Sequence, residues 1–107
     1  MRLKTDADQF DQLQQLFIRE IIEQIRLKLV QAGLRGKELQ DLTTHIAFSV
    51  ASTIDDTARI ESGGVQVRPC LTFVTEDDQL VHGGENSYTH EYVADVVGEI
   101  FSNGAAD

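Results

Sequence analysis

The sequence has one cysteine, one proline and no tryptophan among its 107 residues. One cysteine cannot form an internal disulfide, so packing alone has to stabilise the fold. No apolar run approaches the roughly 20 residues that span a bilayer, and the N-terminal segment MRLKTDADQF lacks the apolar core of a signal peptide. These absences predict a cytoplasmic protein that makes no membrane contact.

Positive charge is scarce and unevenly placed. Nine basic residues face 18 acidic ones, which gives a net charge of −9, and every lysine and arginine lies at or before Arg68. The C-terminal third is therefore purely acidic. This charge disfavours binding to nucleic acids and anionic lipids, whereas a basic protein is a favourable partner.

Length and composition fit one domain over residues 1–107. A chain of this size buries roughly two thirds of its unfolded surface, which supplies a small core without metals or disulfides. Hydrophobic residues make up 41% of the chain and charged residues 25%, as in ordinary globular proteins. The sequence contains no internal repeat, low-complexity tract or linker.

Two amphipathic helices are predicted in the first half of the chain. Thr5 and Asp6 are candidate N-caps of the first helix, which runs to about Ala32 with Gly33 as a left-handed cap. The second helix follows LRGK and ends before SGG at residues 62–64. Apolar residues recur in both at three- and four-residue steps. The stripes consist of Phe10, Leu13, Phe17, Ile21, Ile25 and Leu29 in the first helix and Leu39, Leu42, Ile46, Val50 and Ile54 in the second.

A β-hairpin and a third helix are predicted to follow. The run VQVRPCLTFVT at residues 65–75 alternates like a half-buried strand, and Pro69 indicates a free edge or a bulge. EDDQ forms a turn, LVH returns as a second strand, and Ser87 or Asn86 caps the last helix. The fold class is therefore α+β, in the order helix-helix-strand-strand-helix, with the helices on one side of a small antiparallel sheet. The expected core contains Phe17, Ile21, Ile25, Ile46, Val50, Val67, Leu71, Phe73, Val96 and Ile100.

The stretch LVHGGENSYTHEYV at residues 80–93 holds two of the three histidines. His82, His90 and Glu91 are candidate ligands of a metal ion or members of an acid–base site, but their spacing matches no established metal signature. A structural interpretation accounts for nearly the whole stretch, because the glycines permit a chain reversal, Ser87 caps the helix and Glu91 interacts favourably with its dipole. We therefore expect no metal and no cofactor, and keep an enzyme or metalloprotein that uses these three residues as the alternative.

Four other polar or reactive residues have an ordinary interpretation. His45 lies on the helix surface opposite the apolar stripe. Asp55 and Asp56 form a carboxylate pair of the kind found on exposed helix surfaces. Cys70 has no histidine nearby in the sequence and is expected to be a small buried residue, although folding or dimerisation can bring a histidine to it.

The last helix carries a row of carboxylates. Glu91, Asp95 and Glu99 recur at four-residue steps, so their like charges repel by roughly 0.2 to 0.5 kcal/mol per pair. We expect a cation to offset them, either from a basic partner protein or from an arginine of the same chain. The candidate arginines are Arg19, Arg26, Arg59 and Arg68.

The first helix is apolar on two faces. Leu16, Leu27 and Val30 lie nearly opposite the main stripe, and one core cannot cover both faces. At about 1.5 Å per residue this helix is roughly 37 Å long, much more than the radius of gyration of about 13 Å for a 100-residue domain. We predict that these three residues form a homodimer interface, and that the second subunit also covers open edges of the sheet.

These features together favour a small acidic adaptor or regulatory protein that is not an enzyme and that binds a basic partner through Glu91, Asp95 and Glu99. The alternative is a metal-binding or small-ligand-binding protein or an enzyme. One version of that alternative is a small-molecule pocket between the hairpin and the helices, with Tyr88 and Tyr92 as aromatic walls.

Overall fold

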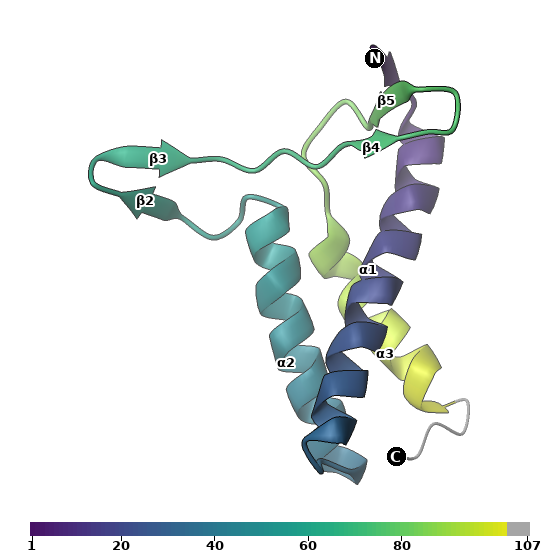
Figure 1. Cartoon of the computed structure of the whole chain (residues 1–107), viewed down its shortest axis with the longest axis vertical. Coiled ribbons are helices and arrows are strands. Elements are labelled where there is room, and N and C mark those ends of the chain that lie inside the picture. The colour runs from purple at the N-terminus through teal and green to yellow at the C-terminus, as the bar shows by residue number, and fades with distance from the viewer. Residues whose placement is uncertain (103–107) are drawn as a thin grey trace.

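The fold consists of three α-helices, one 3₁₀ helix and five short strands within residues 1–102, the part of the chain that the computed structural model describes (Figure 1). The α+β class predicted from the sequence is confirmed. Asp107, counted above in the acidic third, lies outside the described residues. The elements are β1 (Arg2–Thr5), α1 (Ala7–Gln31), α2 (Gly36–Ile54), β2 (Ile60–Ser62), β3 (Val65–Val67), β4 (Phe73–Val74), β5 (Gln79–His82), the 3₁₀ helix η1 (Thr89–Tyr92) and α3 (Val93–Ser102).

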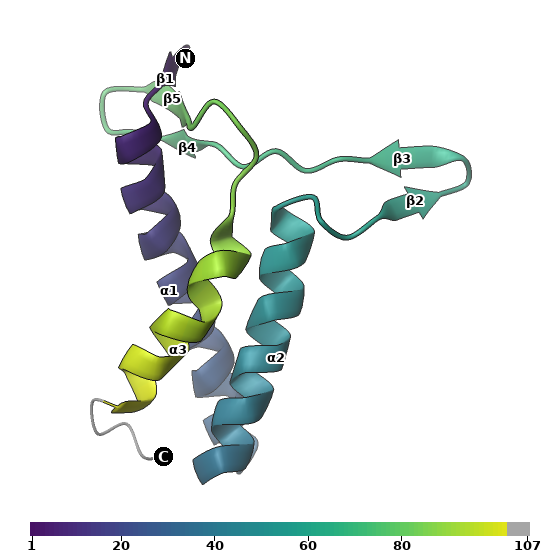
Figure 2. The same cartoon turned by 180° about the vertical axis from the view of Figure 1, so that it is seen from behind.

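The three α-helices form the main core. α1 and α2 make an antiparallel hairpin, and α3 packs behind the pair, as the opposite views of Figures 1 and 2 show. Ala47 and Ala51 of α2 are fully buried, because their small side chains permit a close approach of the other helices. None of these helices combines the length and the apolar character that crossing a bilayer requires within residues 1–102. The core is made of Ile18, Ile22, Ala47, Ala51, Val93, Val96, Val97 and Ile100.

The buried row of α1 differs from the predicted stripe. Ile18 and Ile22 are completely buried, whereas the predicted Phe17 and Ile21 are only half-buried. The predicted stripe is therefore rotated by one residue, about 100° around the helix. Gln14 explains the difference, because it is a fully buried polar side chain that a hydrophobic pattern excludes from the core. Across the whole predicted core, Val96 and Ile100 are buried, and the half-buried members are Phe17, Ile21, Ile25, Ile46, Val50, Leu71 and Phe73.

Local signals place the ends of α1 correctly. Asp6 is the N-cap, and its carboxylate accepts a hydrogen bond from the backbone N–H of Gln9 at 3.0 Å. At the other end Gly33 has φ of 96°, and the N–H of Leu34 donates to the carbonyl of Leu29 at 3.0 Å. These bonds are those of a left-handed glycine cap, as predicted.

A three-stranded sheet covers the N-terminal end of α1 (Figure 1). β5 is central, with β4 antiparallel on one side, as the predicted hairpin required, and β1 parallel on the other. Phe73 of β4 packs on Phe10 and Phe17 of α1, with ring centroids 5.5 and 5.7 Å apart. The expectation of an antiparallel sheet is thus wrong for β1. Its sequence RLKT lacks an alternating pattern and its partner lies far along the chain, so no local signal predicts the pairing.

Gly83 marks a close approach between the end of β5 and α1. A Cβ atom at this position would lie 2.8 Å from the Cδ2 atom of Phe10, which is itself buried. The positive φ of this turn belongs instead to Gly84, at 90°. Gly83 is therefore required by the space it leaves to an aromatic ring rather than by its backbone conformation.

The segment between α2 and β4 forms a projecting hairpin, which we call the arm (residues 60–67). β2 and β3 pair through the SGG turn, where Gly63 and Gly64 have φ of 57° and 80°, as a type I′ turn requires. β3 ends before Pro69, so Val67 is 49% exposed on the arm, and its prediction as a core residue is wrong. Both views show the arm standing away from the helices (Figures 1 and 2). The radius of gyration of 15.6 Å accordingly exceeds the value of about 13 Å for a compact chain of this length.

Candidate functional site

The carboxylate of Asp55 is the centre of a buried hydrogen-bond network. It follows the last turn of α2 and accepts from the hydroxyl of Ser87 at 2.6 Å and from that of Thr89 at 2.9 Å. The backbone N–H of His90 donates to it at 2.8 Å, and the Nδ1–H of the same residue donates at 2.5 Å. Asp55 is 2% exposed, so its interpretation as half of a solvated pair is wrong. The side chain of Asp56 is 11% exposed and pairs with Arg68.

This network replaces the helix cap that the sequence suggested. η1 begins without a side-chain cap from its own segment, and the hydroxyl of Ser87 donates to Asp55. The capping acceptor is Asp55, which binds the N–H of His90 from a different element. Burial alone would raise the pKa of Asp55, but its hydrogen bonds, that of Ser87 foremost, outweigh burial and hold the pKa below the ordinary value of 3.8. Asp55 therefore stays ionised in the folded protein at neutral pH.

A second set of bonds holds the same segment from α1. Buried Gln14 accepts from the backbone N–H of Tyr88 at 3.0 Å and donates to Asp11 at 3.1 Å. The hydroxyl of Tyr92 donates to Asp11 at 2.5 Å, and this bond, together with burial, raises the pKa of Tyr92 to about 12. Residues 87–92 are thus tied to α2 through Asp55 and to α1 through Asp11 and Gln14, an arrangement that we call the clamp.

The clamp orients His90 without activating a nucleophile. In a hydroxyl nucleophile site the imidazole takes the hydroxyl proton and the carboxylate holds the imidazole. Here Ser87 and Thr89 donate to the carboxylate itself, so neither hydroxyl gives its proton to the imidazole. The His90 ring also packs edge-on against Phe48, with centroids 6.0 Å apart. We interpret these bonds as structural, since they join the end of α2 to the start of the last helix.

His82 contacts the lone cysteine, which no pattern in the sequence places beside it. Its Nε2 atom lies 3.7 Å from the Sγ atom of exposed Cys70, and its Nδ1 atom accepts from the N–H of Gly84 at 3.1 Å. A ring nitrogen that accepts a hydrogen bond carries no proton, so in the neutral ring the proton is on Nε2. In that tautomer His82 donates to the sulfur and does not act as a base toward the thiol.

The three candidate metal ligands have different neighbours. His82 faces Cys70, His90 faces Asp55, and Glu91 is exposed on η1. Within residues 1–102 no group of three histidine, cysteine or acidic side chains is placed to hold a metal ion. His45 lies exposed on α2, as predicted.

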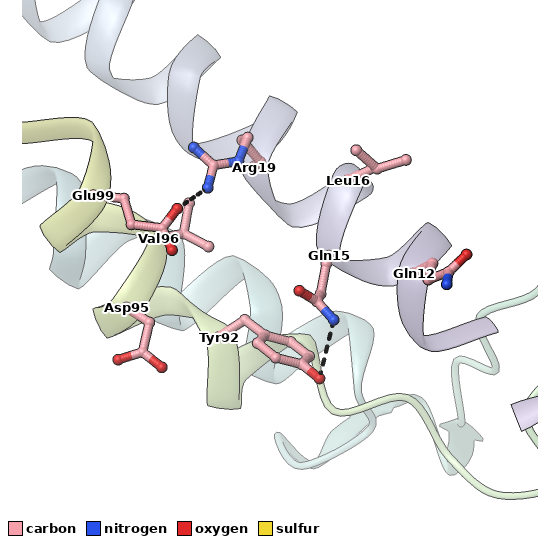
Figure 3. Close-up of a pocket in the computed structure, with 8 residues that line it drawn as sticks. All are labelled: Gln12, Gln15, Leu16, Arg19, Tyr92, Asp95, Val96 and Glu99. Atoms are coloured by element: carbon pink, nitrogen blue, oxygen red, sulfur yellow. Dashed lines mark hydrogen bonds and ion pairs between the residues drawn. The ribbon is translucent and has the colours of Figure 1, made fainter. Parts of the chain in front are cut away.

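A groove between α1 and α3 brings together two features that the sequence analysis treated separately (Figure 3). Leu16, predicted as a dimer residue, is 66% exposed on the α1 side. Asp95 and Glu99, predicted to bind a partner, lie on the α3 side. The groove has a volume of about 430 Å³ and is lined by Gln12, Gln15, Leu16, Arg19, Tyr92, Asp95, Val96 and Glu99.

The charges along the groove are partly paired. Arg19 forms an ion pair with Glu99 across it, so the intramolecular arginine expected for the acidic row exists for this carboxylate (Figure 3). The carboxylate of Asp95 is exposed and points away from α1. Glu91 is exposed as well. All three members of the acidic row are exposed, and one of them, Glu99, is paired with an arginine of the same chain.

The remaining predicted site residues lie near the groove or farther along α1. Leu27 is 42% exposed and Val30 is half-buried, both toward the C-terminal end of the helix. Tyr92 lines the groove between the helices rather than a pocket beside the hairpin, and its ring lies 6.0 Å from that of Tyr88. Gln12 and Gln15 complete the wall on α1, and only the packing of α3 identifies these ordinary surface residues as part of a site.

The chain matches no protein-family model, no curated protein and no solved structure. The groove is therefore the candidate functional site on its geometry and charge alone.

Proposed function

We propose that this protein is a non-catalytic interaction module of the adaptor or regulatory type, whose groove between α1 and α3 binds a basic segment of a partner protein. The observation that carries the proposal is the presence of an exposed leucine and of acidic side chains in one groove. Leu16, 66% exposed, offers an apolar contact, and Asp95 and Glu99 offer charge. An amphipathic segment with lysine or arginine beside an apolar residue matches this combination.

The electrostatics favour such a partner in two ways. The net charge of −9 attracts a basic protein over a distance of about 8 Å at physiological salt, which raises the rate of association. At the groove itself, a cation of the partner can contact exposed Asp95 or compete with Arg19 for Glu99. Such contacts at a partly exposed site act mainly on specificity and on the association rate.

The clamp supports the proposal because it makes the groove rigid before a partner arrives. Tyr92 lines the groove, and its hydroxyl is bound to Asp11 of α1. α3 is therefore held at a set position on α1, so little side-chain and backbone freedom has to be lost on binding.

The alternative of an enzyme or metalloprotein that uses His82, His90 and Glu91 has weaker support. His82 bonds to Cys70 and to the backbone of Gly84, whereas His90 bonds to Asp55, so the two histidines do not share a site. A cytoplasmic location remains part of the proposal, and the exposed free thiol of Cys70 is compatible with a reducing compartment.

Self-association through Leu16, Leu27 and Val30 stays a prediction. Because Leu16 also lines the groove, a dimer that buries it would compete with the partner. A Leu27→Glu variant tests this interface without altering the groove, and light scattering should then show a monomer if α1 carries the dimer contact.

The groove is tested by two substitutions with the same change of charge. Asp95→Lys places a cation on the α3 wall of the groove, and Glu85→Lys places one on the exposed loop before η1. The wild-type protein is immobilised on a resin and incubated with native cell extract. It should capture a partner that is released as the salt concentration rises above about 0.15 M. Asp95→Lys should lose that partner by at least about tenfold, while Glu85→Lys keeps most of it.

Equal losses in both variants would mean that net charge, and not the groove, governs capture. A wild-type protein that captures nothing at low salt would contradict the proposal. Stoichiometric zinc or another transition metal in the purified protein would instead favour the metalloprotein.

A further inference from the structure

The arm has one apolar and one polar face. Residues that pair directly across an antiparallel ladder project to the same side. Ile60 pairs with Val67 and Ser62 with Val65, so the three apolar residues share a face, and the pair of Glu61 and Gln66 forms the other. Val65 and Val67 are 63% and 49% exposed.

Little in the described part of the chain covers this face: Val65 and Val67 are exposed, and Ile60 is half-buried. β2 and β3 contact one another and neither packs extensively on a helix of residues 1–102. The arm stands apart from the helices in both views (Figures 1 and 2). A two-stranded hairpin is at best marginally stable in water without further packing. An uncovered apolar face on such a hairpin therefore indicates an interface.

We propose that two copies of this chain associate through their arms, with the faces formed by Ile60, Val65 and Val67 packed against one another about a two-fold axis. A two-fold axis places the same patch opposite itself, so an apolar face without a charged residue is complementary to its own copy. This inference goes beyond the proposed function, because it assigns the dimer contact to the arm and not to Leu16, Leu27 and Val30 of α1, as the sequence predicts.

The charge distribution favours a second copy as the occupant. Residues 57–75 contain Arg59, Glu61 and Arg68, a net charge of +1 in a chain whose total is −9. Arg68 pairs with Asp56 and Arg59 with Glu61, so both arginines have a carboxylate partner within the same chain. Two copies would repel one another through most of their acidic surface, and the arm, whose one charged residue is Glu61, is where they can approach at the smallest cost. A basic partner, in contrast, would bind more favourably at the acidic groove than at the arm.

The contact that the arms offer is small. An interface of standard size buries about 800 Å² on each partner. The arm alone offers three large apolar side chains per subunit, so we expect a reversible dimer that depends on concentration.

The arm and the groove lie on different parts of the molecule. The arm extends from the end of α2, whereas the groove is formed by α1 and α3 (Figures 2 and 3). A dimer joined by the arms therefore leaves both grooves open, and a partner with two basic segments would bind it more tightly than it binds a monomer.

The first experiment compares Val67→Glu with Gln66→Glu by sedimentation equilibrium. The two variants add the same charge at neighbouring positions of β3, one on the apolar face and one on the polar face. The wild-type mass should rise from 11.9 kDa toward twice that value with concentration. Val67→Glu should raise the dimer dissociation constant by at least about tenfold, and Gln66→Glu by less than about threefold. Leu27→Glu should leave the dimer intact.

Three outcomes would overturn the proposal: a wild type that stays monomeric at about 1 mM, equal effects of the two arm variants, or dissociation by Leu27→Glu with Val67→Glu still dimeric. Far-UV circular dichroism checks that the helices remain folded, since the arm is apart from their core.

A crosslinking experiment gives an independent readout. In a Cys70→Ser background, single cysteines are introduced as Val67→Cys and as Gln66→Cys, and each protein is treated with a short bismaleimide. The Val67→Cys protein should form a covalent dimer and the Gln66→Cys protein should not. Crosslinking at Gln66→Cys alone would place the contact on the other face and contradict the proposal. Partner capture by the groove is measured separately, so either proposal can fail without the other.

Discussion

The clamp and the arm show two ways in which short segments of one small chain are held. Residues 87–92 contain no strand and no α-helix, only the short 3₁₀ helix η1, yet they are tied to α1 and α2 by buried side chains. The arm has a regular backbone ladder, a favourable turn and almost no tertiary packing. Regular secondary structure and firm placement are therefore separate properties. Placement depends on buried partners, which the clamp has and the arm lacks as a monomer.

Among substitutions in the clamp and the arm, Asp55→Asn should cause the largest loss of stability. An amide turns one oxygen acceptor of the buried group into a donor that faces other donors, and the negative charge is lost. We expect a loss of about 3 kcal/mol in the free energy of unfolding. In a domain of this size that loss lowers the melting temperature by roughly 10 to 20 °C, measured by thermal denaturation.

The neighbouring Asp56→Asn variant is the control. Asp56 pairs with Arg68, which is 69% exposed, and asparagine tolerates the φ of 62° at this position. Its loss should stay below about 1 kcal/mol. Equal losses in the two variants would show that the buried network does not hold the clamp.

The dependence of stability on pH in the acid range gives a second test of the Asp55 network. The pKa of Asp55 is depressed in the folded state, so its contribution is complete above the ordinary value of 3.8 and is lost as the pH falls through the folded pKa. Asp55→Asn should flatten this part of the curve.

Gly83→Ala should have the next largest effect. A methyl group here would lie 2.8 Å from the ring of Phe10, and the ring is buried and has little room to move. Overpacking of this kind costs about 1 to 3 kcal/mol. The matched change is Gly98→Ala in α3, where nothing lies within 4 Å of the added methyl group. That variant should gain up to about 1 kcal/mol in urea denaturation, because alanine favours a helix over glycine. A destabilised Gly98→Ala protein would mean that the space around α3 is occupied, for example by a second subunit.

Tyr92→Phe should have a smaller effect, of about 1 kcal/mol, because it removes the hydrogen bond to Asp11 and a long, weak one from Gln15 at the edge of the groove. The pKa of Tyr92 gives a direct readout of the bond to Asp11. The neutral phenol is favoured in the folded state, so this contribution is present below the ordinary pKa of 10.0 and is lost as the pH rises through about 12. Ultraviolet titration of the wild type should show a transition near 12 that Tyr92→Phe lacks. A transition near 10.0 for both tyrosines would show that Asp11 does not accept this bond.

The smallest effect is expected in the arm. Val67→Glu should change the unfolding free energy of the monomer by less than about 0.5 kcal/mol, because the exposed side chain contacts no core residue. A large loss at monomer concentrations would mean that the arm packs on the body, and the contrast with the clamp would no longer hold.

Features that depend on neighbouring residues were predictable from the sequence. The N-cap at Asp6, the glycine cap at Gly33 and the β4–β5 hairpin each follow from a few adjacent side chains, and all are present. The exposed acidic row of the last helix also follows from its four-residue spacing. These signals are local because caps and turns bond to residues only a few positions away.

Features that depend on distant partners were decided by the tertiary structure alone. Gln14 and Asp55 look like surface residues in the sequence, and they are buried because Tyr88 and residues 87–90 bring matching donors to them. β1 forms because β5 offers it an edge, and the groove exists because α3 packs beside α1. A polar side chain is stable inside a protein only when its partners arrive with it, and the order of residues along the chain does not state which partners will meet.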